Sequence, residues 1–151
     1  MPPSATPNEA NEAIEAKRPI FTYRDLIVWQ KGIMLVTETY DVTAGFPREE
    51  IYGLTSQMRR AATSIPSNIA EGRRKGSTKD FLKFLRIAYG SGAELETQIE
   101  IAKRLPMTAH LNYQKVDSLL NEIMRMLHVI IQKLRPIHKL PKKNPNEATG
   151  I

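Results

Sequence analysis

Four segments of the chain carry large apolar residues at the three- and four-residue spacing of an amphipathic α-helix. They start near residues 22, 47, 78 and 108, and end near residues 45, 72, 105 and 135. No segment shows the alternation of apolar and polar residues that is typical of a half-buried strand, and the connections are short. The pattern predicts an all-α fold, an up-down-up-down antiparallel four-helix bundle with helices of about 20 to 27 residues.

Residues with known helix-end preferences define these boundaries. The expected N-terminal signals are the Thr22–Asp25 capping box, Pro47 in a first turn, Ser77 or Thr78, and Thr108. Gly72 is expected to be the C-terminal cap of the second helix, and Pro106 and Pro136 to follow the last two helices.

Each predicted helix has one apolar stripe that should face the core. The stripes are Leu26, Trp29, Ile33, Val36 and Tyr40; Ile51, Leu54, Met58, Ala61, Ile65 and Ile69; Phe81, Leu85, Ala88, Gly92, Leu95, Ile99 and Ala102; and Val116, Leu119, Ile123, Met126, Ile130 and Leu134. Other apolar residues fall outside these stripes, namely Ile27, Val28, Met34 and Leu35 in the first helix and Leu82, Phe84, Ile87 and Tyr89 in the third. Because broad exposed apolar patches usually mark association, the pattern predicts a homo-oligomer.

Two helix interiors contain residues that disfavour a helix. Pro66 removes a backbone donor and predicts a kink in the second helix, where Ser64, Ser67 and Asn68 could bond the freed carbonyl. Gly90 and Gly92 each lower helix stability by about 1 kcal/mol relative to alanine. The expected compensation is the close approach of another backbone, from the same chain or from another subunit.

Both ends of the chain have a different composition from the bundle. Residues 1–20 are rich in Pro, Asn, Glu and Ala, and residues 136–151 are basic and broken by prolines, so both are expected to be disordered tails on a bundle of residues 21–135. The start has no apolar core of a secretory signal, and no apolar run reaches the ~20 residues that span a bilayer. We therefore expect a cytoplasmic protein.

The chain lacks the patterns of the common catalytic and metal sites. It contains no cysteine, and none of its three histidines follows a glutamate by three residues, as in the di-metal sites of helical bundles. No phosphate-binding glycine loop or nucleophile elbow occurs. Glu94, Glu96 and Glu100 cluster on the third helix, but Glu100 precedes Arg104 by four residues, the spacing of a surface ion pair. We expect no enzyme activity, no cofactor and no metal.

The net charge of +6 comes from one stretch of the sequence. Residues 57–90 contain eight cations and two anions, whereas cations and anions balance in the rest of the chain. The cations are Arg59, Arg60, Arg73, Arg74, Lys75, Lys79, Lys83 and Arg86. A cationic turn that continues into a cationic helix stripe is typical of phosphate-backbone binding, so these eight residues are the candidate nucleic-acid site. With Tyr89 as the aromatic residue near this stripe, a platform that stacks single-stranded bases is not expected.

Three alternatives remain open at this point. The basic face could be an ordinary solvated surface or could bind an acidic protein, which would make the chain an interaction scaffold. The basic segment 133–143 could also touch an anionic membrane, but its prolines prevent a long amphipathic helix.

Three blocks of the sequence resemble a known family. They are "DLIVWQKG" (25–32), "FPREEIYGLTSQMRRAATSIPSNIAEG" (46–72) and "FLKFLRIAYGSGAELETQIEIAKRL" (81–105). They are similar to the bacterial four-helix-bundle proteins known from intervening sequences in large-subunit ribosomal RNA genes. Positions that match the family pattern are Arg59, Arg60, Pro66, Asn68, Glu71, Gly72, Arg86 and Glu94; Gly90 and Gly92 depart from it.

The resemblance carries further implications. It implies a bundle that assembles into a pentameric ring, and a distant relation to the accessory variability determinant of diversity-generating retroelements. That relative is a basic pentamer that binds nucleic acid and a reverse transcriptase. The resemblance and the charge distribution together predict an accessory protein that binds structured RNA or an RNA/DNA hybrid, with DNA as a further possible ligand.

Overall fold

The structure is a computed structural model that describes residues 22–136, and the expected tails fall outside this range apart from Pro136. Its elements are η1 (Tyr23–Asp25), α2 (Ile27–Thr43), η2 (Arg48–Glu50), α3 (Leu54–Arg74), α4 (Thr78–Arg104) and α5 (Gln114–Leu134). Each long helix packs against two neighbours in the cyclic order α2, α3, α4, α5, and α3 makes its most extensive contact with α4. The predicted all-α architecture of four long helices is confirmed for this range, which contains no strand.

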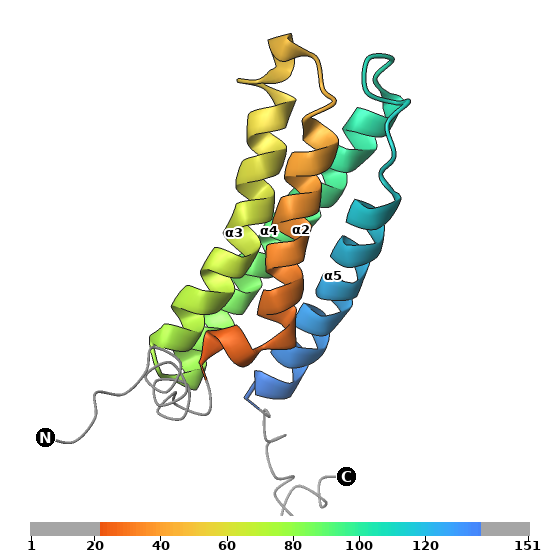
Figure 1. Ribbon diagram of the computed structural model, residues 1–151. Coiled ribbons are helices and arrows are strands. Elements are labelled where there is room, and N and C mark those ends of the chain that lie inside the picture. Colours follow the sequence, from red (N-terminus) through yellow and green to blue (C-terminus); the bar gives the residue numbers. More distant parts are fainter. Residues whose placement is uncertain (1–21, 137–151) are drawn as a thin grey trace, which may run out of the picture.

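The four helices run side by side and alternate in direction (Figure 1). The α3–α4 turn, η1 and the end of α5 lie at one end of the bundle, and η2 and the α4–α5 connection lie at the other. Thr22 and Pro136, where the described chain begins and ends, are therefore both at the end that carries the α3–α4 turn. None of the helices within residues 22–136 is long and apolar enough to cross a bilayer.

The core stripe of α4 is confirmed almost completely. Leu85, Ala88, Leu95, Ile99 and Ala102 are all buried, with Gly92 between them and Phe81 partly buried at the helix start. In α3 the predicted stripe is buried from Leu54 to Ile69, but Ile51 precedes the helix and is exposed. In α5 the predicted Val116 and Ile123 are buried, whereas the remaining core positions are Leu120, Met124, Leu127 and Ile131.

The predicted core stripe of α2 is only partly confirmed. Leu26, Trp29 and Val36 are partly buried and pack against the core, but they do not form its most buried face. The buried face is Val28, Gly32, Leu35, Thr39 and Thr43, whereas the predicted Ile33 and Tyr40 are 41% and 47% exposed. Thr39 and Thr43 tolerate burial because each hydroxyl donates to the carbonyl oxygen four residues earlier, at 2.7 Å in both cases. Gly32 is in the core because Pro66 of α3 packs against it, with a Cβ built there only 3.2 Å from the proline Cβ.

Several predicted helix ends are also corrected. The Thr22–Asp25 capping box exists, but it caps the short η1 turn rather than α2. Pro47 precedes η2, and α3 begins only at Leu54. Thr108 is buried and donates to the carbonyl oxygen of Ala102 at 2.6 Å, so it secures the α4–α5 connection instead of capping α5.

Gly72 does not end α3. The helix continues to Arg74 with Lys75 as its C-cap, and Gly76 supplies the positive φ of 86° that a helix C-terminus commonly needs. Gly72 is buried because the aromatic residues of α4 press against it, and a Cβ there would lie 2.5 Å from the Cβ of Phe84. The predicted cap is therefore a close-packing position between α3 and α4.

Residues around Pro66 link α3 to α4. The helix α3 runs through Pro66, and the predicted kink of its axis stays a prediction. Asn68 donates to the carbonyl and the hydroxyl oxygens of Ser64, not to the carbonyl that Pro66 leaves free. The hydroxyl of Ser64 in turn bonds that of Ser91 on α4 at 2.8 Å, so a small polar network crosses the interface.

Candidate nucleic-acid interface

Seven cations gather at the end of the bundle that carries the α3–α4 turn. Arg73 and Arg74 form the last turn of α3 and Lys75 is its C-cap, rather than all three lying in a free turn as predicted. After Gly76, Ser77 caps α4 by accepting from the Asp80 amide at 3.1 Å, which starts the next helix at once. We call the following residues the cationic end: Arg73, Arg74, Lys75, Lys79, Lys83, Arg86 and Arg135.

A groove between the start of α4 and the end of α5 runs through the cationic end. It has a volume of about 1270 Å³ and is lined by Lys79, Lys83, Arg86 and Arg135, with Asp80 as its one acidic side chain. Leu82, Leu134 and Pro136 provide apolar surface, and Thr78 and Gln132 provide polar groups. This mixture of cations, polar groups and apolar surface can contact the phosphates and the sugars of a nucleic acid.

Arg135 lies in the basic segment 133–143 but is not among the eight residues predicted to bind nucleic acid. It lies about 50 residues from the other cations in the sequence, outside the window in which the net charge accumulates. Its position could have been predicted from the topology, because an up-down-up-down bundle brings the end of the fourth helix to the start of the third.

Aromatic rings lie beneath several of these cations. The guanidinium carbon of Arg74 is 5.5 Å from the centre of the Tyr23 ring, and that of Arg73 is 6.0 Å from the Phe81 ring. The ammonium groups of Lys75 and Lys83 lie 6.0 Å and 5.8 Å from the Phe84 ring. Cations within about 6 Å of a ring are attracted by its negative face, so the rings help to hold these side chains at the surface.

The prediction that Tyr89 is the aromatic residue near the cationic stripe is therefore wrong. Phe81, Phe84 and Tyr23 are the rings in contact with it, and all three are partly buried. Tyr89 lies instead beside His128 of α5, with the ring centres 6.3 Å apart.

None of the seven cations makes an ion pair with another residue of 22–136. The ion pairs of this range join Lys31 to Glu122, Lys103 to Asp117, and Glu100 to both Lys103 and Arg104. The predicted Glu100–Arg104 surface pair is confirmed, at 3.5 Å. Asp80 accepts a hydrogen bond from the Ser77 hydroxyl at 2.9 Å, so its carboxylate belongs to the helix cap. Within residues 22–136, the charge of the cationic end is thus not neutralised by ion pairs.

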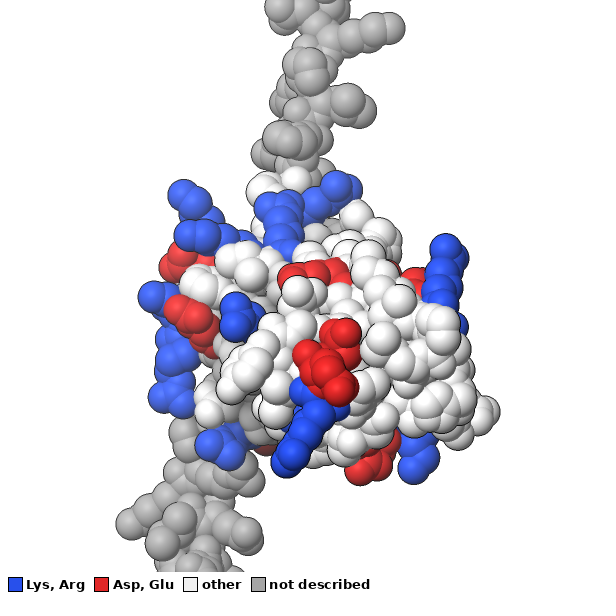
Figure 2. Space-filling view, turned by 90° about the horizontal axis from the view of Figure 1, so that it is seen from above, with Lys and Arg blue, Asp and Glu red and all other residues white. Residues whose placement is uncertain are grey.

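The opposite end of the bundle has a different surface. Figure 2 shows it from above, with lysine, arginine, aspartate and glutamate side chains mixed around a large uncharged area. The two residues with a shifted pKa lie here. The hydrogen bond from Lys103 to Asp117 raises the lysine pKa, and burial raises the pKa of the Tyr113 hydroxyl.

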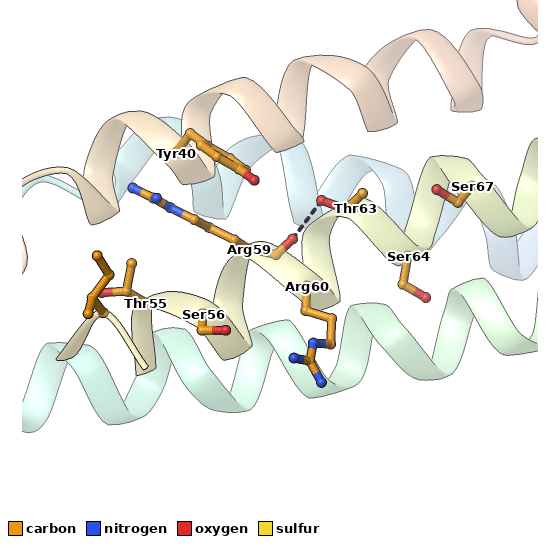
Figure 3. Close-up of a pocket in the computed structure, with 9 residues that line it drawn as sticks. Tyr40, Thr55, Ser56, Arg59, Arg60, Thr63, Ser64 and Ser67 are labelled. Atoms are coloured by element: carbon orange, nitrogen blue, oxygen red, sulfur yellow. Dashed lines mark hydrogen bonds between the residues drawn. The ribbon is translucent and has the colours of Figure 1, made fainter. Parts of the chain in front are cut away.

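Arg59 and Arg60 do not belong to the cationic end. They lie about 22 Å from Arg74 along α3, at 1.5 Å per residue. The Arg59 Nε donates to the Thr43 hydroxyl at 2.9 Å and its guanidinium stacks on Tyr40 at 4.3 Å, so this side chain fastens α3 to α2. Figure 3 shows Arg59 beneath Tyr40 and Arg60 pointing away from it, towards α4.

These two arginines line a separate groove of about 540 Å³. Its other residues are Tyr40, Ile51, Thr55, Ser56, Thr63, Ser64 and Ser67. The Thr63 hydroxyl donates to the carbonyl oxygen of Arg59, and the Ser64 hydroxyl bonds that of Ser91. Two of the hydroxyl groups that line this groove are therefore already used in hydrogen bonds within the fold.

The residues predicted to be structural have distinct roles. Pro66, Asn68 and Gly72 lie at the contacts of α3 with α2 and α4 described above. Glu71 is exposed, and its carbonyl accepts from the Lys75 amide at 3.1 Å. Gly92 faces α5, where a Cβ would lie 2.1 Å from the Met124 Sδ, whereas a Cβ on Gly90 would meet nothing within 4 Å. The close approach that was expected at both glycines therefore occurs within the chain only at Gly92. The group that approaches it is the Met124 side chain, not a backbone.

No group of three or more histidine, cysteine, aspartate and glutamate side chains that could hold a metal occurs in the part of the chain that the structure describes.

Comparison with known proteins identifies the family. Residues 24–129 match the model of the 23S rRNA-intervening sequence protein family. The chain belongs to this family. Among solved structures, a crystal structure of a protein of unknown function from the S23 ribosomal protein family of Bacteroides thetaiotaomicron is similar, with 26% identity and a TM-score of 0.58. That match covers 70% of this chain and 99% of the other. No curated protein matches the chain.

Proposed function

We propose that this member of the 23S rRNA-intervening sequence protein family binds nucleic acid through its cationic end. The observation that carries the proposal is the convergence of seven cations from three helices on one end, without ion-pair partners in residues 22–136. A phosphate backbone offers a dense row of anions, and cations that neutralise it release condensed counterions, which drives binding.

Structured RNA or an RNA/DNA hybrid is the preferred ligand. The family's description, which refers to 23S rRNA, supports RNA over an acidic protein as the partner. The contacts available are mostly to phosphate, which position a nucleic acid without reading its sequence. We therefore propose binding by shape and charge, with a reverse transcriptase as a possible protein partner on the basis of the family resemblance.

Self-association would strengthen such binding. Several large apolar side chains of α2 face outward, among them Ile27 and Met34 at 58% and 52% exposure, and residues of this kind commonly form subunit contacts. We propose a ring-like homo-oligomer, and the family resemblance supplies the number five. Each subunit would present one cationic end, so modest contacts would add up along a single ligand.

We propose that the chain is a non-enzymatic, cofactor-free cytoplasmic binding protein. The exposure of the charged side chains at the cationic end, some of them along a groove, supports a binding surface.

The direct test is a binding titration against labelled structured RNA, duplex DNA and single-stranded DNA over a series of salt concentrations. Each duplex-DNA phosphate that a cation neutralises contributes about 0.9 to the slope of log affinity against log salt. Replacing Arg73, Arg74 and Lys75 together by alanine should weaken binding and reduce that slope by up to about 2.7 for duplex DNA.

The matched control replaces three other exposed cations, Arg104, Lys115 and Arg125, and so removes the same charge away from the cationic end. Equal losses in both triple variants would show that total charge, not this site, determines binding. Absence of binding to all three ligands at low salt would reject the proposal and favour a protein-interaction scaffold.

A further inference from the structure

The charges on the outer face of α4 change sign across Gly90, and the exposed Arg104 at the far end of this face is paired with Glu100. Lys83 and Arg86 lie seven and four residues before this glycine, and Glu94 lies four residues after it. All four residues are exposed on the side of α4 that faces away from the core. None of the three charged side chains has an ion-pair partner within residues 22–136, although Glu94 accepts a hydrogen bond from Gln98 at 3.3 Å.

The helix itself gives no electrostatic reason for this division. Opposite charges stabilise a helix when they are three or four residues apart, and like charges at this spacing destabilise it. Lys79, Lys83 and Arg86 are nonetheless successive neighbours at four and three residues, and Glu94 is eight residues from Arg86. The arrangement therefore costs free energy in the isolated chain.

No contact within residues 22–136 requires a glycine at position 90. Gly32, Gly72 and Gly92 all pack against a neighbouring helix so closely that a Cβ would come within 3.2 Å of another side chain. A Cβ on Gly90 would meet nothing within 4 Å, yet a glycine inside a helix is less stable than alanine by about 1 kcal/mol. An unhindered glycine on an exposed helix face lets a second helix come unusually close.

An antiparallel copy of α4 matches both features. If two α4 helices cross at Gly90 around a two-fold axis, residues before the glycine on one helix lie beside residues after it on the other. Arg86 of one copy then lies opposite Glu94 of the second copy, and Lys83 lies about one helical turn away, opposite Thr97. The two-fold symmetry repeats the contact. A parallel pair would instead place cations against cations.

We propose that α4 is a self-association surface in which two copies of this chain pair antiparallel about Gly90. This contact is separate from the apolar α2 surface of the proposed ring, and it does not depend on nucleic-acid binding. It does share Lys83 and Arg86 with the cationic end, so a bound nucleic acid and a second copy compete for these two side chains.

Charge-reversal variants test the pairing. The variants Glu94→Lys and Lys83→Glu/Arg86→Glu are each expected to weaken self-association at least tenfold, because both place like charges in contact. Sedimentation velocity at low salt, on protein freed of nucleic acid, should show the mass of the wild-type particle halved in each variant. An equimolar mixture of the two variants should restore the mass. In the mixed pair, the Glu94→Lys site of one chain lies beside the Lys83→Glu/Arg86→Glu sites of the other, so opposite charges meet, while the second contact remains native.

Two controls separate this contact from other effects. Glu49→Lys changes the charge equally at an exposed site in η2 and should leave the mass unchanged. Glu94→Lys alters none of the cations proposed to bind nucleic acid, so it should lose self-association while retaining nucleic-acid binding. If the wild-type protein self-associates but does not bind RNA, the proposed function is rejected and the proposed α4 contact is retained.

A cross-linking experiment gives a second, independent measurement. Because the chain has no cysteine, Gly90→Cys places a single thiol at the proposed two-fold axis. Mild oxidation should convert it to a disulfide-linked dimer, whereas Ser118→Cys, an exposed site on α5, should stay uncross-linked. Unaltered mass in the charge variants, a mixture that fails to reassociate, or equal cross-linking of both cysteine variants would overturn the proposal.

Discussion

Gly90 and Gly92 lie two residues apart in α4, yet alanine should have opposite effects at the two positions. The Gly90→Ala side chain would extend into open space, so the only change is in helix propensity. The Gly92→Ala side chain would lie 2.1 Å from the sulfur of Met124 and 3.1 Å from its terminal methyl carbon. The sulfur and the methyl carbon form the end of a flexible side chain that must shift, and the burial of Met124 in the α4–α5 contact limits where it can go.

The magnitudes follow from two contributions to the free energy of unfolding. Helix propensity favours alanine by about 1 kcal/mol at both positions. Overpacking of a filled core costs about 1–3 kcal/mol and applies only at position 92. Gly90→Ala should therefore stabilise the bundle by about 1 kcal/mol, whereas Gly92→Ala should destabilise it by up to about 2 kcal/mol. The difference between the two variants isolates the steric cost.

Urea unfolding followed by far-UV circular dichroism measures both values. It should be done at low protein concentration and high salt, so that charge-dependent self-association does not add to the stability. Met124→Ala in the Gly92→Ala background removes the atoms in conflict, and the two changes should be non-additive by about 1 kcal/mol or more. If the two glycine variants are equally stable, the end of Met124 moves aside without cost, and the predicted steric penalty at position 92 is refuted.

Two further predictions concern other contacts. Gly72→Ala should destabilise the bundle more than Gly92→Ala does, because its Cβ would lie 2.5 Å from the Cβ of Phe84, an atom fixed to the α4 backbone; a smaller loss in urea unfolding would contradict this packing. Stability should also fall at alkaline pH, because the hydrogen bond to Asp117 raises the pKa of Lys103 above 10.5 and burial raises that of Tyr113 above 10.0. The folded chain keeps these protons longer than the unfolded chain, so their stabilisation is complete below the ordinary pKa values and is lost as the pH rises through the raised ones. Tyr113→Phe should make the fall less steep, and an identical pH profile would refute the contribution of Tyr113.

The helices were predictable where the core is made of large apolar side chains. The α4 stripe is an example, since each position from Leu85 to Ala102 is apolar or glycine. The buried face of α2 was not predictable in this way. Gly32 is buried because Pro66 packs against it. Thr39 and Thr43 can be buried because their hydroxyl groups donate to carbonyl oxygens of the same helix. These are tertiary contacts or local bonds that leave no apolar signal.

The same distinction applies to the candidate site. The charge window collected the cations from Arg73 to Arg86, which are neighbours in the sequence and also lie together in the fold. It included Arg59, which is committed to Tyr40 and Thr43, and it missed Arg135, which only the folded topology brings near. Sequence proximity therefore locates a site within one helix turn or hairpin but cannot set its limits across the bundle.

The chain enters the bundle at Thr22 and leaves it at Pro136 on the same end as the candidate interface (Figure 1). An affinity tag, fluorophore or surface anchor attached before Thr22 or after Pro136 is therefore joined to the bundle at the end where a nucleic acid would dock, and a charged tag could mask or imitate binding. Tyr52, which is 95% exposed at the far end, is a better attachment point after conversion to cysteine. A label there reports binding without touching the surface under study, and immobilisation through it leaves that surface facing the solution.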